Sequence, residues 1–133
     1  MRLNTLMSVY AWVAGIFCAG LLLIPAFWNA LYGAAVDTQA TVLLRLVGAL
    51  FGGLAIMVWI GRNAERSKSR DAMVLGLAVL NGLAAGVALL GALSGVYNQF
   101  SWGPVATFTM FCIGFLVVGQ AGRSHSTPDR SPS

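Results

Sequence analysis

Charged residues are scarce in this chain of 133 residues. Aspartate, glutamate, lysine and arginine together make up 9% of the sequence, whereas apolar residues make up 58%. A soluble globular domain carries about 25% charged residues. Because so few charges cannot cover a surface that faces water, we expect most of the chain to face lipid. The length allows one domain.

Side chains that carry chemistry are scarce as well. The only histidine, His125, lies near the C-terminus, and Cys18 and Cys112 form no C-x-x-C motif. These absences argue against haem ligation, a zinc site and disulfide exchange within the apolar segments. No carboxylate falls within those segments, which argues against proton-coupled transport of the kind found in small multidrug exporters. We therefore expect no catalytic residue, metal or cofactor in this chain alone, and an enzymatic role is disfavoured.

Four apolar segments are each close to the ~20 residues that cross a bilayer as a helix. They cover residues 6–25, 40–60, 72–93 and 104–119. The first exceeds the core of about 7–15 residues in a signal peptide, so we expect it to remain as a span. The sequence therefore predicts an all-α integral membrane four-helix bundle over residues 1–119. Residues 120–133 are polar and rich in proline and serine, which predicts a disordered cytoplasmic tail.

The basic residues predict how the spans are oriented. Seven of the eight lie at the N-terminus, between spans two and three, or after span four: Arg2, Arg62, Arg66, Lys68, Arg70, Arg123 and Arg130. The positive-inside rule makes these regions cytoplasmic, with both termini inside, in a bacterial inner membrane. We expect the central basic loop to fix this topology and to contact anionic lipid headgroups. The basic residues cluster without aromatic residues between them, which argues against nucleic-acid binding.

Small residues recur four positions apart on three of the spans. Such spacing lets helix backbones approach closely in lipid, where no hydrophobic drive brings helices together. The three series are Ala11, Gly15 and Ala19; Gly48 and Gly52; and Ala78, Gly82 and Gly86. They predict helix packing within the chain, in a homo-oligomer or against a larger partner, and the sequence does not separate these three.

Arg45 is the one charge within the second span. Its spacing to Gly48 and Gly52 puts all three on one helix face, so we expect Arg45 to point toward protein. It has a structural interpretation, in which it reaches the outer headgroups or pairs with Asp37. It also has a functional one, in which its guanidinium anchors a carboxylate, a phosphate or a quinone carbonyl.

Asn81 lies near the middle of the third span. A buried amide in a membrane usually hydrogen-bonds to another helix, which is worth about 0.6–2 kcal/mol. We expect that role for Asn81 ahead of ligand contact, and the antiparallel neighbour would let Arg45 reach it.

The stretch from Arg45 to Trp102 resembles a widespread group of small bacterial four-helix membrane proteins without assigned activity. The resemblance rests on Arg45 with Gly48, Trp59 with Arg62, Asn81, and the tetrapeptide 93–96 (Leu-Ser-Gly-Val). It covers under half of the chain. It implies a membrane bundle in which Arg45 and Asn81 have a role, and it implies no activity.

Two functions fit these features best. The leading expectation is a non-enzymatic accessory or scaffold subunit that packs into a membrane complex or oligomer. The alternative is binding or transport of a small hydrophobic or amphiphilic ligand, such as a lipid or quinone. Its polar anchors would be Arg45 and Asn81 with Tyr97, Asn98 and Gln99, which follow the third span.

Overall fold

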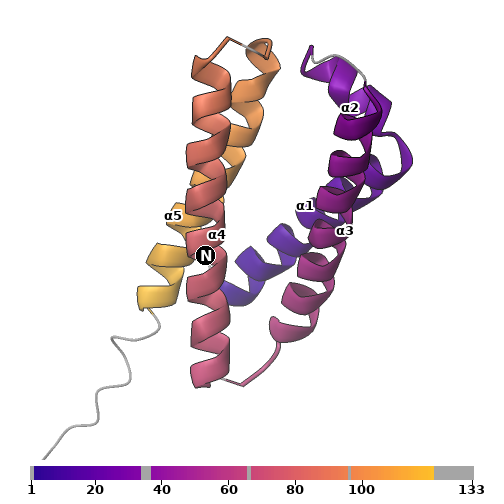
Figure 1. Cartoon of the computed structure of the whole chain (residues 1–133). Coiled ribbons are helices and arrows are strands. Elements are labelled where there is room, and N and C mark those ends of the chain that lie inside the picture. The colour runs from indigo at the N-terminus through magenta and orange to yellow at the C-terminus, as the bar shows by residue number, and fades with distance from the viewer. Residues whose placement is uncertain (1, 34–36, 66, 96, 122–133) are drawn as a thin grey trace, which may run out of the picture.

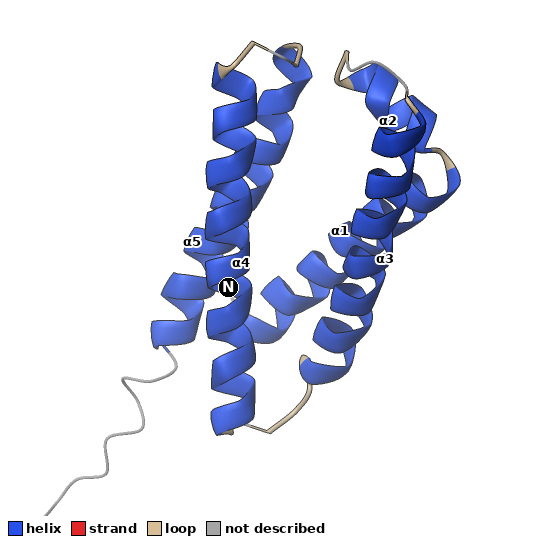
Figure 2. Cartoon of the chain, in the orientation of Figure 1, coloured by secondary structure: helices blue, strands red, loops and turns tan. Residues whose placement is uncertain are grey.

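The computed structural model describes residues 2–33, 37–65, 67–95 and 97–121, and these residues are helical without any strand (Figure 2). The helices are α1 (Leu3–Leu23), α2 (Pro25–Leu31), α3 (Thr38–Gly61), α4 (Lys68–Leu93) and α5 (Trp102–Ala121), with a 3-10 turn η1 (Gln99–Ser101) before α5. Four of them are long and apolar enough to cross a membrane. This confirms the predicted all-α chain with four long apolar helices. The predicted tail lies almost wholly outside the described residues.

Local sequence signals set where several helices begin and end. Pro25 has no backbone N–H to continue α1, so α1 ends at Leu23 and Pro25 starts the short helix α2. The Asp37 carboxylate accepts a hydrogen bond from Ala40 N at 2.6 Å and caps α3. Ser67 Oγ accepts one from Arg70 N at 3.2 Å and caps α4.

The long helices form two antiparallel pairs. Helix α1 packs along α3, and α4 packs along α5. Figure 1 shows the pairs meeting toward the end that holds the connection between α3 and α4 and diverging toward the end that holds α2. Arg62 and Arg70 flank that connection, and η1 lies at the opposite end with α2. We call these the basic end and the aromatic end; the latter carries Trp28, Tyr32, Tyr97 and Trp102.

The core holds the pairs together in the half of the bundle nearer the basic end. Tyr10 of α1 makes edge-to-face contacts with Phe111 and Phe115 of α5, at centroid distances of 4.9 and 5.4 Å. Around these rings pack the other buried residues: Leu6, Met7, Ala11, Ala14, Val58, Val74, Leu77 and Ala78. The core therefore joins all four long helices, whereas the half toward the aromatic end has no comparable cluster among the described residues.

Glycines on α3 allow the close approach of α1. A Cβ at Gly48 would lie 3.0 Å from Leu21 Cβ, and one at Gly52 would lie 2.8 Å from Cys18 Sγ. At Gly15 and Gly86, by contrast, a Cβ would meet no atom within 4 Å. The small-residue series on α3 is thus used within the chain, while parts of the other two face open space.

Polar contacts close the basic end. Arg70 Nη2 donates to Asn4 Oδ1 at 2.6 Å and to the Arg62 carbonyl at 2.9 Å. The Arg62 guanidinium lies over the Trp59 ring, 3.2 Å from its centroid. These contacts connect the starts of α1 and α4 with the end of α3. Arg62 and Arg70 thus have a structural role in addition to the predicted contact with lipid headgroups. Of the other two basic residues in this loop, Lys68 begins α4 and Arg66 lies outside the described residues.

Candidate functional site

A cleft of about 410 Å³ lies between the two helix pairs at the aromatic end. It falls within the ~300–1,000 Å³ range of small-molecule sites. Its lining comes from α2, α3, α4 and the segment around η1: Asn29, Tyr32, Ala40, Leu43, Leu44, Val47, Val87, Ala88, Gly91, Tyr97, Ser101 and Pro104. The cleft exists because the core fills only the half of the bundle nearer the basic end.

The walls of the cleft are apolar. Leu43 and Val47 on α3 and Val87 on α4 line it and are exposed. The exposed lining residues lie on α3 and α4 and, with Tyr97, just after α4, so we infer that the cleft is open on the side formed by these two helices. The Tyr97 ring packs where a Gly91 side chain would be, since a Cβ there would lie 3.2 Å from Tyr97 Cε2.

Asn98 bridges the two helix pairs at the aromatic end of the cleft. Its backbone N–H donates to the Tyr32 carbonyl at 3.1 Å, and its Nδ2 donates to the Leu31 carbonyl at 2.8 Å. Its Oδ1 accepts from Phe100 N at 3.0 Å. Gly33, with φ of +72°, lies against the Asn98 side chain and has the left-handed conformation that favours glycine. Asn98 is therefore a structural bridge, since its amide groups already have protein partners.

Two other cleft residues, Asn29 and Ser101, have a polar side-chain group without a hydrogen-bond partner among the described residues. Asn29 is only 7% exposed, and its Nδ2 has no hydrogen-bond partner among the described residues. Ser101 is also 7% exposed, and its hydroxyl makes no hydrogen bond within the described part of the chain. The Asn29 Nδ2 atom itself is fully buried, and most such groups in native proteins have a partner. These two residues thus supply an unused N–H donor and an unused hydroxyl beside the apolar walls.

The cleft is electrically neutral. Its described lining includes no aspartate, glutamate, lysine, arginine or histidine. Burial raises the pKa of the Tyr32 hydroxyl above its ordinary value of 10.0, so this group stays protonated at neutral pH. The arrangement can bind a molecule through neutral hydrogen bonds and apolar contacts.

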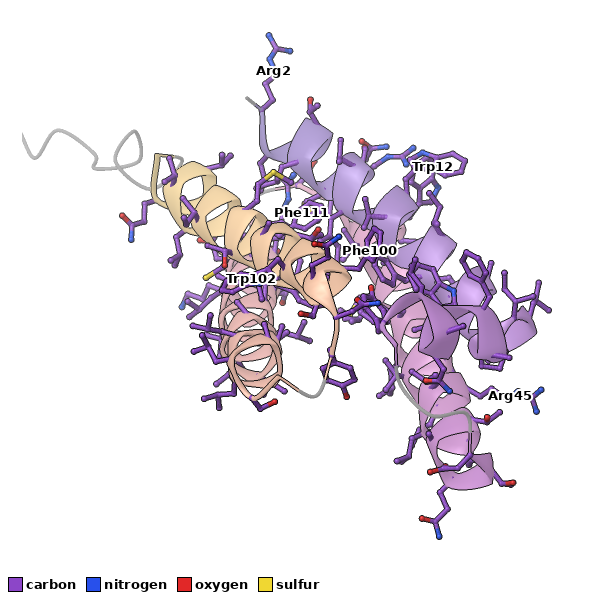
Figure 3. All side chains as sticks on the ribbon, turned by 90° about the horizontal axis from the view of Figure 1, so that it is seen from above. Arg2, Trp12, Arg45, Phe100, Trp102 and Phe111 are labelled. Atoms are coloured by element: carbon purple, nitrogen blue, oxygen red, sulfur yellow. The ribbon has the colours of Figure 1, made fainter. Side chains whose placement is uncertain are left out.

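Arg45 does not line the cleft. Its side chain is exposed and points away from the α4–α5 pair (Figure 3). It makes no ion pair or hydrogen bond with any described residue, Asp37 included. The expected orientation toward protein is not found because α1 ends at Leu23, level with Gly48, so no α1 turn lies opposite Arg45.

Asn81 lies in the core and not in the cleft. It is fully buried, and its Nδ2 donates to the Leu77 carbonyl of its own helix at 2.8 Å. Tyr10 of α1 is buried in the same half of the bundle. Neither Tyr10 Oη nor Asn81 Oδ1 completes a hydrogen bond with a described residue. The hydrogen bond to another helix that we expected for Asn81 is therefore not found among the described residues, and neither is a contact between Asn81 and Arg45.

The polar residues after α4 take three different places. Tyr97 lines the cleft, Asn98 bridges the helix pairs, and Gln99 begins η1 with an exposed side chain. Sequence reasoning missed Asn29 and Ser101, because both lie in the connections between the predicted spans, where burial depends on how the helices pack. The only signal was a single amide within the apolar and aromatic stretch 26–32, and its burial depends on where α2 lies.

Comparison with protein-family models, curated proteins and solved structures finds no match for this chain. The resemblance to small bacterial four-helix membrane proteins therefore stays a prediction. Within the described residues, no group of three or more histidine, cysteine, aspartate or glutamate side chains could hold a metal ion. The case for function rests on the cleft.

Proposed function

We propose that this chain is a multi-pass protein of the bacterial cytoplasmic membrane with both termini in the cytoplasm. Support comes from large apolar side chains exposed on every long helix, among them Trp12, Leu50, Leu83 and Ile113. Lipid around the bundle would cover this surface without any partner protein. The basic end then faces the cytoplasm, and the aromatic end lies at the opposite headgroup level. Arg45 would extend along α3 to that same headgroup level.

Topology reporters test this orientation. Fluorescent-protein fusions at the N- and C-termini should both be active in the cytoplasm, because the basic residues hold those ends there. A reporter inserted after Gly33, between α2 and α3, should be active only outside. Activity of the two terminal fusions in opposite compartments would contradict the proposed orientation.

Within this membrane protein, the function that the geometry supports best is binding of a small amphiphilic molecule from the outer leaflet. The observation that carries the proposal is the unpartnered Asn29 amide in a cleft that opens sideways between α3 and α4. A molecule already dissolved in lipid gains little from apolar burial alone, because lipid tails are as apolar as the cleft walls. Selective binding therefore depends on the polar groups at the aromatic end.

Filling the cleft tests this function directly. Val87 lines the opening and is 72% exposed, so a larger side chain there should block the cleft without disturbing the core. We expect Val87→Trp to lower binding of an amphiphile at least about tenfold, which is about 1.4 kcal/mol. Native mass spectrometry of the full chain from mild detergent, with added ketone-headed amphiphile, would measure the bound fraction.

Leu90→Trp is the matched control. Leu90 lies on the same helix, is 70% exposed and does not line the cleft, so the variant should bind as the wild type does. Equal binding by both variants and the wild type would contradict a ligand site in the cleft.

An accessory subunit in a membrane complex or homo-oligomer is the second candidate. It is favoured by the open space at Gly15 and Gly86, where another helix backbone could approach closely. The same purification separates the two functions. A polypeptide that co-purifies in fixed stoichiometry, or a stable oligomer, would favour the accessory role, whereas a bound small molecule that Val87→Trp removes would favour ligand binding.

A further inference from the structure

We infer that the cleft selects an uncharged amphiphile whose head carries a hydrogen-bond acceptor, such as a ketone or ester carbonyl, with Asn29 Nδ2 as the donor. This inference rests on the proposed binding function and specifies its ligand class. Asn29 and the absence of charge from the cleft's described lining carry it. The sequence suggests Arg45 as the polar anchor, whereas this inference places the anchor at Asn29 on α2.

The Asn29 amide argues for an acceptor on the ligand. Nδ2 is a donor, is buried and has no partner among the residues that the structure describes. A buried donor without a partner destabilises the protein, and a carbonyl oxygen placed beside it would remove that penalty. Asn98 makes a useful contrast, because one N–H of its Nδ2 already donates to the Leu31 carbonyl and its side chain does not line the cleft.

The neutral lining argues against a charged head. An anion in the cleft would meet no cation in the described lining, and Arg45 points elsewhere. The acidic residue nearest along the chain, Asp37, caps α3 through Ala40 N, and Ala40 itself lines the cleft. Asp37 would repel a carboxylate or phosphate, and its own carboxylate already accepts that backbone N–H. Placing an unpaired charge in such a site is strongly unfavourable.

The distribution of polar and apolar lining residues orients the ligand. Asn29 and Ser101 lie at the aromatic end, whereas Val47 and Val87 lie farther along α3 and α4 toward the core. The α3 wall runs from Ala40 to Val47, which is seven helical steps, or about 10 Å of helix. The head would therefore lie against α2 and η1, with the tail directed toward the core and able to leave sideways into lipid.

Matched probes test the head group. Dodecyl methyl ketone, dodecanoate and dodecyltrimethylammonium, each with a diazirine at the same tail carbon, would be added to the full chain in nanodiscs. Photolabelling would be mapped to peptides by mass spectrometry, and labelling of Val87→Trp would be subtracted as partition into lipid. We expect ketone labelling on residues 29–47 and 87–104, with affinity at least about tenfold above that for either charged probe.

Two substitutions at Asn29 test the donor. Asn29→Leu should lower ketone affinity about tenfold, because the carbonyl loses its partner. Asn29→Asp should also lower it, and should raise affinity for the ammonium probe about tenfold through a new charge pair. Because only a folded protein can gain affinity for the ammonium probe, this gain would show that the lower ketone affinity of Asn29→Asp does not come from misfolding.

The outcomes separate the inference from the function on which it rests. If no probe labels the cleft of the wild type above the Val87→Trp background, the binding function itself fails. If the probes label the cleft but the charged ones bind as well as the ketone, only the proposed ligand class is overturned. The same conclusion follows if ketone affinity is unchanged in Asn29→Leu and Asn29→Asp.

Discussion

Replacing Gly48 with leucine should force α1 and α3 apart and lower the stability of the bundle by about 1–3 kcal/mol. A Cβ at this position would lie 3.0 Å from Leu21 Cβ and 3.2 Å from Leu22 N. The second contact is with backbone, so no rotation of a side chain can relieve it. Unfolding of the full chain by increasing the fraction of denaturing detergent in mixed micelles, followed by circular dichroism, would measure the change.

Gly53→Leu provides the matched control for this prediction. Gly53 lies on the same helix, and a Cβ there would meet no atom within 4 Å. Both substitutions gain about 0.8–1 kcal/mol of helix propensity. The difference between their stability changes therefore measures the steric clash of the new leucine side chain at position 48 with α1. An equal shift in both variants would show that α1 and α3 are not in close contact at Gly48. Because Val47 lies in the cleft wall, Gly48→Leu should also weaken amphiphile binding.

The four long helices could be predicted from the sequence because length and apolar content determine them locally. That Gly48 and Gly52 lie on one helix face could also be predicted, since residues four apart share a face. Arg45 shows where this reasoning stops. Helix periodicity places Arg45 near the face of Gly48 and Gly52, but its environment depends on where the neighbouring helix ends. That helix, α1, ends at Leu23.

The candidate site was less predictable than the helices because segments far apart in the chain form it. Asn29 is buried only because α2 folds beside the ends of the other helices. The bridge from Asn98 to the Leu31 carbonyl joins residues 67 positions apart. Sequence patterns within single spans carry no information about such contacts. The burial of Asn81 was easier to predict, because a single amide in the middle of an apolar helix is expected to face protein whatever the arrangement of the helices. Its hydrogen bond was not predicted, since the amide donates to the Leu77 carbonyl of its own helix and not to another helix.

Replacing Phe111 with alanine should have the other large effect, because this ring lies where the two helix pairs meet. Phe111, labelled in Figure 3, is 2% exposed. It makes an edge-to-face contact with Tyr10 of α1 and stacks with Phe115 at a centroid distance of 6.4 Å. Removing a buried phenylalanine typically costs about 3–5 kcal/mol in soluble proteins. In lipid the transfer part of that cost is smaller, but the lost contacts and the cavity remain.

We therefore expect Phe111→Ala to destabilise the bundle by about 2–4 kcal/mol in the same unfolding measurement. Met110→Ala is its control, since Met110 is adjacent and 61% exposed, and it should change stability by less than about 0.5 kcal/mol. The core fixes the angle between the pairs, so Phe111→Ala should also reduce ketone labelling of the cleft while Met110→Ala leaves it unchanged. Similar stability in both variants would mean that the contact of Phe111 with α1 does not hold the two pairs together.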